Sequence, residues 1–312
     1  MATSASQAAT ANRPRPAGDR RRGSGPRTVR STLGLKLPAV LLLVLWMIVP
    51  LVMTLWFSFQ RYNLLDASDR GFAGLDNYAY LLTDPGLAQA IWNTVLLVGW
   101  VLVITVGLGT LLAVLFDQEF WGRGVARVLV IAPFFVMPTV SALVWKNLLM
   151  HPVNGLFSWL ARSFELEAID WFGDLPLISI IVMVAWQWLP FATLILLTSV
   201  QGLDPERKEA ARMDGAGPVA MFFHIIVPHL SRSIGVVIMI ETLFLLSIFA
   251  EIFVTTGGGP GFASTNLTFL IYRYALREYD VGGASAGGVI AIVLANVVAM
   301  FLMRSLRRSI EA

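Results

Sequence analysis

The sequence predicts an all-α, polytopic membrane protein with six transmembrane helices. Of its 312 residues, 56% are hydrophobic and only 14% are charged, whereas soluble domains carry about 25% charged residues. The apolar residues gather in six stretches of roughly the 20 residues that a helix needs to cross a bilayer. The sequence contains no cysteine, which excludes disulfides, thiolate metal sites and a cysteine nucleophile.

The chain opens with a polar segment, residues 1–36, that is rich in Ala, Ser, Pro and Arg. This segment carries eight Lys and Arg residues and one acidic residue, Asp19. Such a composition buries too little apolar surface to fold, so it predicts a disordered basic tail. The run of arginines at 20–22 precedes a membrane span and is typical of an orientation signal, so we expect no nucleic acid as a partner.

The membrane domain is predicted over residues 37–303, with a short tail over 304–312. The first apolar run has 21 residues, which is longer than the roughly 7–15 residues of a signal-peptide core, and no A-x-A site follows it. Prolines interrupt two of the later spans, where neighbouring helices can satisfy the carbonyls that they free. The predicted spans are Leu37–Phe57, Thr94–Phe116, Val128–Leu149, Leu175–Leu197, Ile234–Val254 and Ala284–Met303.

The distribution of Lys and Arg predicts the orientation of these spans. With the N-terminus inside, the inner segments carry 17 Lys and Arg residues and the outer loops carry five. Cytoplasmic loops are enriched in these residues. The sequence therefore predicts that both termini, and the polar loop Asp204–Pro228, lie in the cytoplasm.

The loop Asp204–Pro228 is the longest polar interruption in the C-terminal half, and it carries its own helix signals. Asp204 is a good N-cap, and Pro205 suits the first helical position. Gly215 is placed to end the helix with a positive φ. These signals predict a ten-residue helix, Pro205–Asp214, that lies outside the bilayer. A short, capped helix in this position is suited to binding by another protein.

The same loop resembles a known family. An E-A-A triplet begins at Glu209, a Gly follows after three residues, an Ile after nine more, and then Val227-Pro228. This spacing resembles the EAA loop of binding-protein-dependent ABC importer permeases, with Val227 in place of Leu. In that family the loop is the coupling helix, which docks into a cleft on the ATP-hydrolysing subunit. The resemblance implies that the residues coupling this chain to an ATPase are Glu209, Ala210, Ala211, Asp214 and Gly215.

The resemblance extends from about Leu37 to Arg304. Thr255–Gly261, with Thr268, Asp280 and the small-residue run Gly282–Gly288, resembles the last outer loop of the family and the entry to its last span. Phe249–Gly261 with Asp280–Asn296 looks most like permeases for sugar alcohols such as sorbitol and mannitol. The residues that resemble the first outer loop are Phe72, Gly74, Leu75, Asn77, Tyr78, Asp84, Asn93 and Thr94.

The resemblance implies a type I, maltose-permease-like fold in a bacterial inner membrane, and uptake of a carbohydrate, a sugar alcohol or small sugar. It also implies three kinds of partner: a second homologous permease subunit, two ATP-binding cassette subunits, and an extracellular or periplasmic solute-binding protein. No Lys follows a Gly anywhere in the sequence, which excludes a G-K-[ST] phosphate loop. ATP and Mg²⁺ are therefore expected on the partner ATPases, with no cofactor and no metal site in this chain.

Ionisable and aromatic residues within the spans are candidates for a substrate pathway. Glu241 and Glu251 are ten residues apart on one predicted span, which places them roughly 80° apart on a helical wheel and able to face one cavity. Trp186 and Gln187 lie in the middle of the fourth span. An aromatic face with amide and carboxylate acceptors suits a neutral polyhydroxylated solute; alternatively, Trp fills packing space and Gln bridges helices. Lys146, near the outer end of its span, is expected to snorkel.

Two other functions stay open at this point. Residues 283–287 match G-x-S-x-G around Ser285, and His151 is predicted on the same side of the membrane, an arrangement that an intramembrane serine hydrolase would need. The small residues around Ser285 equally suit close helix packing. An ion-coupled transporter using Glu241 and Glu251 would need no coupling helix, and the sequence has no evident internal repeat of the kind that many such transporters contain.

Overall fold

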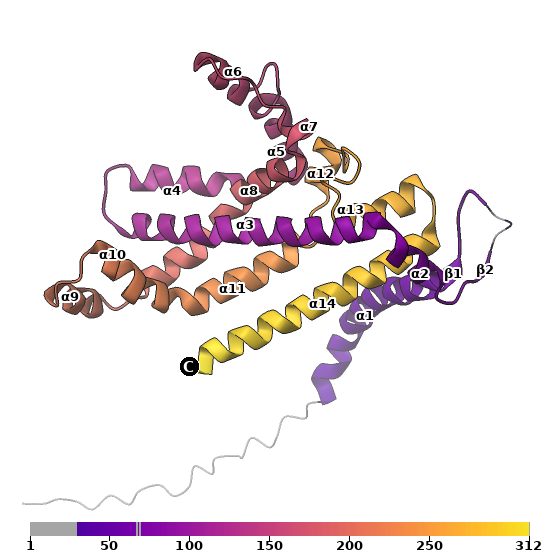
Figure 1. Ribbon diagram of the computed structural model, residues 1–312. Coiled ribbons are helices and arrows are strands. Elements are labelled where there is room, and N and C mark those ends of the chain that lie inside the picture. Colours follow the sequence, from indigo (N-terminus) through magenta and orange to yellow (C-terminus); the bar gives the residue numbers. More distant parts are fainter. Residues whose placement is uncertain (1–29, 67, 69, 312) are drawn as a thin grey trace, which may run out of the picture. The chain divides into compact units, whose positions relative to one another are not determined.

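The computed structural model describes residues 30–66, 68 and 70–311. The predicted basic tail lies outside the described residues up to residue 29, and the first helix begins at Arg30. Over the described residues the chain is mostly helical, with one two-stranded antiparallel ribbon (Figure 1). In chain order the elements are α1 Arg30–Ser58, β1 Gln60–Arg61, β2 Gly71–Phe72, α2 Asp76–Thr83, α3 Pro85–Asp117, α4 Arg123–Ile131, η1 Ala132–Phe135, α5 Pro138–Val144, η2 Trp145–Leu149, α6 Leu156–Ser163, α7 Trp171–Asp174, α8 Pro176–Gln201, α9 Pro205–Met213, α10 Pro218–Met221, η3 Phe222–Ile226, α11 Val227–Leu245, α12 Ala250–Thr255, α13 Leu267–Tyr272, η4 Arg273–Arg277 and α14 Val281–Glu311.

The chain divides into two units, Met1–Pro50 and Leu51–Ala312. In the first unit, every side chain from residue 36 to residue 50 is exposed. The stretch Lys36–Ser58 is long and apolar enough to cross a membrane, as predicted for the first span. An apolar helix this exposed needs lipid or another protein around it.

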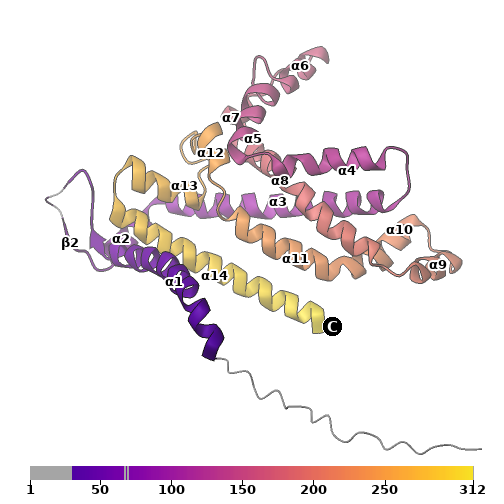
Figure 2. The ribbon, with the colours of Figure 1, turned by 180° about the vertical axis from the view of Figure 1, so that it is seen from behind.

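The second unit is a bundle built on α3 and α8, which pack along each other, with α11 against both (Figures 1 and 2). α14 packs against α11 and α13. The turn between α3 and α4 lies at one end of this bundle with α9 and α10, and the ribbon β1–β2 lies at the other end (Figures 1 and 2). We call these the α9 end and the ribbon end.

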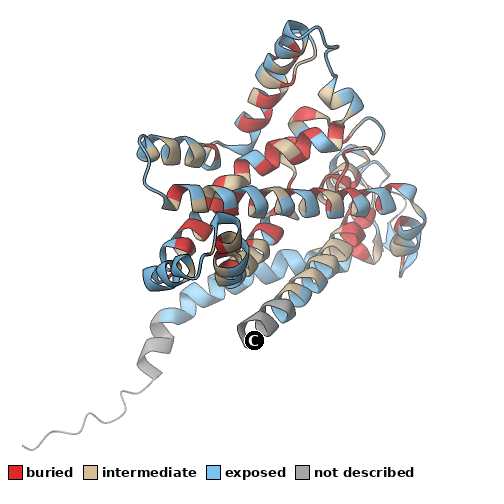
Figure 3. Ribbon diagram, turned by 60° about the vertical axis from the view of Figure 1, so that its left-hand side comes forward, coloured by how far each residue is buried: buried red, intermediate tan, exposed pale blue. Residues whose placement is uncertain are grey.

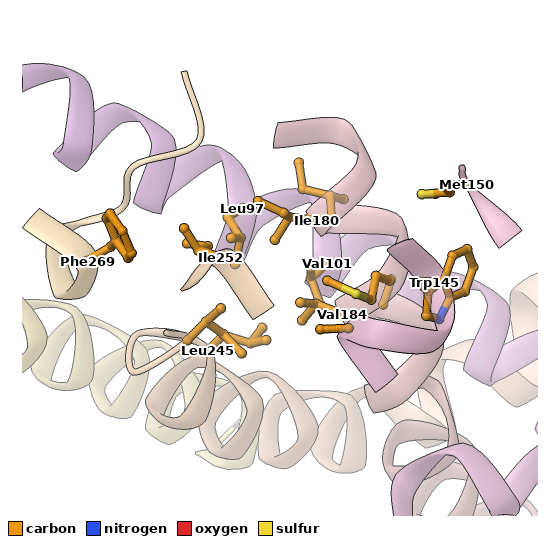
Figure 4. Packing of buried hydrophobic residues seen from close by; sticks show 14 residues of the cluster. Leu97, Val101, Trp145, Met150, Ile180, Val184, Leu245, Ile252 and Phe269 are labelled. Atoms are coloured by element: carbon orange, nitrogen blue, oxygen red, sulfur yellow. The ribbon is translucent and has the colours of Figure 1, made fainter. Parts of the chain in front are cut away.

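Buried side chains line the facing sides of these helices, while the outward sides are exposed (Figure 3). The central cluster joins α3, α8, α11 and α13 through Leu97, Val101, Val184, Leu245 and Phe269 (Figure 4). A second cluster packs the α9 end. Its buried members include Ala113, Phe116, Leu196, Leu203, Met221, Ile226 and Leu230.

Among the described residues, five helices are long and apolar enough to cross a membrane, and a bent pair gives up to a sixth. The last helix, α14, continues to Glu311 and so runs through the segment predicted as a tail, 304–312. The five single helices are Lys36–Ser58, Pro85–Asp117, Pro176–Gln201, Pro218–Leu245 and Val281–Arg304.

The predicted third span is the bent pair, so its prediction as one helix is wrong. The segments Arg123–Phe135 and Pro138–Leu149 meet at an angle of 108°. Val136 and Met137 between them are extended, with ψ of 130° and 138°. Proline lacks an N–H and disfavours the helical conformation in the preceding residue. Pro138 therefore ends one helix and starts another, instead of only kinking a continuous span.

The predicted fifth span, Ile234–Val254, is also wrong at its outer end. α11 stops at Leu245, and the short helix α12 follows from Ala250. Side chains from a distant part of the chain satisfy the carbonyls freed at this break: the Asn266 side-chain amide donates to Ile248 O at 2.6 Å, and the Thr268 hydroxyl donates to Leu246 O at 2.9 Å. Backbone at membrane depth can be irregular only where such partners exist.

Candidate functional sites

The helix α9 forms where the local signals predict it. The Asp204 side chain accepts from the Glu206 backbone N–H at 3.0 Å, and Pro205 occupies the first helical position. Gly215 follows the helix with φ of +83°, a conformation that a residue with a Cβ adopts only under strain. The helix ends at Met213 with Asp214 as its C-cap, one residue shorter than predicted.

The E-A-A triplet is divided between two faces of α9. Glu209 and Ala210 are exposed, as is Met213, which is 88% exposed. Ala211 and Lys208 are partly buried, and Ala211 packs against the cluster at the α9 end. Asp214 and Gly215 are exposed at the helix end. The exposed face, with the Glu206 and Glu209 carboxylates and the apolar Met213 side chain, suits docking of another protein.

A cavity of about 450 Å³ lies where the two helix breaks face each other, within the usual range of roughly 300–1,000 Å³ for small-molecule sites. One break, at Val136, separates η1 from α5, and the other separates α11 from α12. The helix α8 supplies the rest of the wall. The lining residues are Phe134, Val136, Pro138, Gln187, Trp188, Phe244, Ser247, Ile248, Phe249, Ala250 and Glu251.

Aromatic rings dominate the walls of this cavity. The Trp188 ring contacts Phe134 edge-on at 5.8 Å between centroids and Phe244 at 5.3 Å. Phe249 stacks on Phe269 at 5.9 Å, which ties this wall to the central cluster. Aromatic pairs in these offset or edge-on arrangements contribute about 0.5–1.5 kcal/mol beyond the area that they bury, which favours this arrangement of the walls.

Three polar side chains interrupt the apolar walls: Gln187, Ser247 and Glu251. The Gln187 Nε2 donates to Val136 O at 2.8 Å and so satisfies a carbonyl at the first break. Its Oε1 is buried and finds no donor among the described residues. Glu251 is 3% exposed and lies in the first turn of α12. Side chains that carry acceptor atoms therefore line the cavity among the aromatic rings.

Lys146 fixes the helix that carries Glu251. Its Nζ donates to Val254 O at 3.0 Å and to Thr255 O at 2.7 Å, the last carbonyls of α12. A cation at a helix C-terminus is favourable because the free carbonyls carry partial negative charge. The prediction that Lys146 snorkels is therefore wrong: the side chain caps a neighbouring helix.

Two predicted pathway residues do not line this cavity. Trp186 packs edge-on against Trp145, at 5.6 Å between centroids. Glu241 is fully buried on α11, and its Oε2 accepts from the Thr105 hydroxyl on α3 at 2.6 Å. The prediction that Glu241 and Glu251 lie on one helix and face one cavity is wrong, because α11 ends at Leu245, between them. Gln187 and Glu251 do meet at the cavity.

Several residues that resemble the family's first outer loop act as anchors at the ribbon end. The Asn93 side-chain amide donates to Phe262 O at 2.8 Å and to Thr265 O at 2.9 Å. The Tyr274 hydroxyl donates to the Asp84 carboxylate. Burial, together with this acceptor, raises the pKa of Tyr274, so the hydroxyl stays a donor at neutral pH. These residues hold the loop that follows α12 against α3.

The predicted hydrolase pair is not assembled. Ser285 lies in the second turn of α14 and is 9% exposed. The His151 Nδ1 accepts from the backbone N–H groups of Val153 and Asn154 at 3.2 Å, within its own loop. Among the described side chains no hydrogen bond joins the two residues, and no group of three or more His, Asp or Glu is placed to hold a metal.

The sequence analysis missed Trp188, Phe134 and Phe244. Trp188 is adjacent to the predicted Gln187, and Phe134 lies between two prolines that mark the break. A search for aromatic residues between closely spaced prolines would have found Phe134, whereas Pro190, two residues after Trp188, lies inside the continuous helix α8 and marks no break. No local signal identifies Phe244, because the break after Leu245 contains no proline.

The chain resembles known transport proteins over most of its length. Residues 105–312 match the family described as binding-protein-dependent transport system inner membrane component. A probable ABC transporter permease protein, y4oQ of Sinorhizobium fredii, is 32% identical over 87% of this chain and 88% of its own length. The trehalose/maltose transport system permease protein MalF of Thermococcus litoralis is 30% identical over 87% and 92%.

The fold is that of known ABC importers. A crystal structure of a bacterial ABC transporter involved in the import of the acidic polysaccharide alginate matches with a TM-score of 0.76 over 89% of this chain and 96% of its own, at 21% identity. The similarity confirms the predicted type I permease fold. With the family match over two thirds of its length, this chain belongs to the binding-protein-dependent inner membrane components, the multi-pass permeases of ABC transporters.

Proposed function

We propose that the chain is one of two permease subunits of an importer for a neutral carbohydrate, a sugar alcohol or small sugar. The observation that carries this proposal is the cavity at the two helix breaks, with its aromatic walls, the unpaired Gln187 Oε1 and the Glu251 carboxylate. Aromatic faces suit the C–H faces of a polyol, and acceptors suit its hydroxyls. The cavity contains no Lys or Arg to clamp an anion.

The names of relatives support a carbohydrate. Besides the trehalose/maltose permease, relatives include the sulfoquinovosyl glycerol transport system permease protein SmoG of Agrobacterium fabrum, 28% identical over 86% of this chain. Their named solutes differ in size and charge but share the polyhydroxyl character. The walls of the cavity favour the neutral members of this class.

The cavity also implies a partner within the membrane. The cavity is only partly enclosed, and a carboxylate such as Glu251 is expensive to face toward lipid. A second, homologous permease subunit placed over this opening would enclose the pathway. The same contact would cover exposed rings such as that of Phe244.

The remaining partners follow from the two ends of the bundle. The exposed face of α9 docks into one of two ATP-binding cassette subunits, which hold ATP and Mg²⁺. A solute-binding protein delivers the carbohydrate at the ribbon end. ATP binding then biases an equilibrium between inward-facing and outward-facing arrangements, with both termini in the cytoplasm of a bacterium.

Reconstitution tests this function. The chain is expressed with candidate permease, ATPase and binding-protein partners, and the purified complex is placed in vesicles with trehalose, maltose, sorbitol, mannitol or glycerol 3-phosphate as solute. We expect uptake that requires ATP and the binding protein, and that prefers a neutral solute. Uptake without any ATPase subunit would overturn the importer, and preference for the charged solute would overturn the substrate class.

A further inference from the structure

An ion pair joins the predicted coupling helix to the longest helix of the bundle. The Lys208 Nζ on α9 lies 2.7 Å from the Asp117 Oδ2 at the end of α3. Both side chains are largely buried, with 23% and 26% of their surfaces exposed. Ninety-one residues separate the two positions in sequence, so the contact is tertiary and reports how α9 sits on the bundle.

The pair lies on the face of α9 that is turned toward the bundle. Lys208 precedes Ala211 by three residues, and residues at this spacing share a helix face. Ala211 packs against the cluster at the α9 end. Glu209 and Met213 occupy the opposite, exposed face. α9 therefore has one face for an external partner and another, anchored by Lys208, for the bundle.

The position of Asp117 at the C-terminus of α3 makes a cationic partner such as Lys208 favourable. As the last residue of α3, its carboxylate is next to free carbonyls that carry partial negative charge, which disfavours an acid there. The neighbouring carbonyls already have cationic donors: Arg127 donates to Phe116 O at 2.5 Å, and Arg123 to Gln118 O at 3.2 Å. Lys208 supplies the cation that the Asp117 carboxylate requires.

The ion pair lies at the wall of a cavity. A space of about 630 Å³ lies between α9 and the end of α3, and its lining includes Asp117, Glu119, Lys208 and Arg212. A charge-assisted hydrogen bond is shorter and about twice as strong as a neutral one, and it has a defined direction. At this place the polar contact is suited to carry force between the two helices.

The helix α3 leads from this contact to the candidate pathway. It is 33 residues long, about 50 Å at ~1.5 Å per residue. Leu97 and Val101 on α3 pack in the same cluster as Val184 on α8, about one turn from the cavity residues Gln187 and Trp188. A displacement of the α3 end therefore reaches the cavity wall through close-packed side chains.

We propose that Lys208 and Asp117 form the contact through which displacement of α9 moves α3, a positioning pair for energy coupling that acts in addition to the docking face. The proposal rests on the importer function proposed above. It assigns the pair to transmission between helices and not to contact with the ATPase or the solute.

Charge reversal tests the pair in the assembled transporter. Lys208→Asp and Asp117→Lys should each lower the solute taken up per ATP hydrolysed by roughly tenfold, the scale of a typical coupling energy. The double variant Lys208→Asp with Asp117→Lys restores an opposite-charge pair and should recover most of the uptake. The matched control is Glu167→Lys, which makes the same charge change at an exposed position in the loop before α7 and should transport normally.

A covalent link in place of the Lys208–Asp117 ion pair gives a second test, which applies even if charge reversal disturbs assembly of the transporter. The chain has no native cysteine, so Lys208→Cys with Asp117→Cys can be joined by a short bifunctional thiol reagent. Uptake should be low before cross-linking and should rise after it, because the tether replaces the ion pair. Normal coupling in both single reversals, or loss of the remaining uptake on cross-linking, would overturn the pair. Wild-type uptake in the same vesicles tests the importer function separately.

Discussion

Glu251 places a carboxylate in a cavity whose other walls are largely aromatic. A neutral polyol would donate hydroxyl hydrogen bonds to it, and such bonds to a charged group contribute about 1.5–3 kcal/mol. We expect Glu251→Leu to lower uptake by roughly tenfold or more, since about 1.4 kcal/mol corresponds to a factor of ten. Glu251→Gln keeps the shape and an acceptor and should lower uptake only modestly.

Uptake by vesicles at matched expression measures this effect. Glu167→Leu is the control, because Glu167 is exposed in the loop before α7 and lines no part of the cavity. Normal uptake by Glu251→Leu would show that the carboxylate is structural and that the solute passes elsewhere.

Trp186 and Trp188, two residues apart on α8, have different surroundings. Trp188 lines the cavity, whereas Trp186 packs on Trp145. Trp188→Ala should raise the solute concentration needed for half-maximal uptake by severalfold, while Trp186→Ala should leave it unchanged. The pair is its own control, because both substitutions remove an indole from the same helix. A larger increase in this concentration for Trp186→Ala than for Trp188→Ala would indicate that the solute passes on the other side of α8.

Ser285 is a packing residue by its surroundings. It lies between the buried residues Ala284 and Ala286 at the start of α14, and members of this permease family are not enzymes. Ala is also small enough for close helix packing, so Ser285→Ala should support normal uptake. Labelling of Ser285 by a fluorophosphonate probe would contradict this assignment.

At the scale of elements, the sequence predicts best what local signals determine. The limits of α9 follow from Asp204, Pro205 and Gly215, which act within one turn, and the predicted helix differs from the observed one by a single residue. The break after Leu245 is different, because it depends on Asn266 and Thr268. These partners are distant in sequence, and hydropathy over 234–254 records only that the stretch is apolar.

The coupling helix yields a prediction about its two special positions. Glu209 is exposed and Gly215 has a positive φ, so neither substitution removes a core contact. Glu209→Ala should remove a docking contact, and Gly215→Val should distort the helix end, since a β-branched residue at positive φ is strained. Both variants should assemble less well with the ATPase or transport less.

Co-purification of the ATPase subunit and uptake measure these losses. Gly217→Ala is the matched control, because Gly217 has an ordinary φ of −72° and open space around its Cα. Wild-type assembly and uptake in both Glu209→Ala and Gly215→Val would refute the docking role of α9.

At the scale of the whole molecule, the cavity could not be predicted from the sequence. Its walls come from η1, α8, α11 and α12, and Phe134 and Glu251 are more than a hundred residues apart. Only tertiary packing brings them together. Composition did predict the membrane class, and proline positions marked one of the two breaks, but neither indicates which side chains share a cavity.

The two ends of the bundle make the orientation testable with cysteine labelling. The chain has no native cysteine. Met213 at the α9 end is 88% exposed, and Leu65 at the ribbon end is 74% exposed. Because 17 of the Lys and Arg residues fall on the segments predicted inside and five on those outside, the α9 end should face the cytoplasm.

A membrane-impermeant maleimide should therefore label Leu65→Cys in right-side-out vesicles and Met213→Cys only in inside-out vesicles. Detergent-solubilised samples give the total labelling of each variant, and the cysteine-free chain gives the background. The chain is labelled without its ATPase partner, which would cover α9. The reverse pattern would place α9 outside the cell, away from ATP. In that case α9 could not couple the chain to an ATPase, and the proposed coupling mechanism would be wrong. Labelling of both positions from one side would instead mean that α3, whose length exceeds the ~30 Å hydrocarbon core, does not span the membrane.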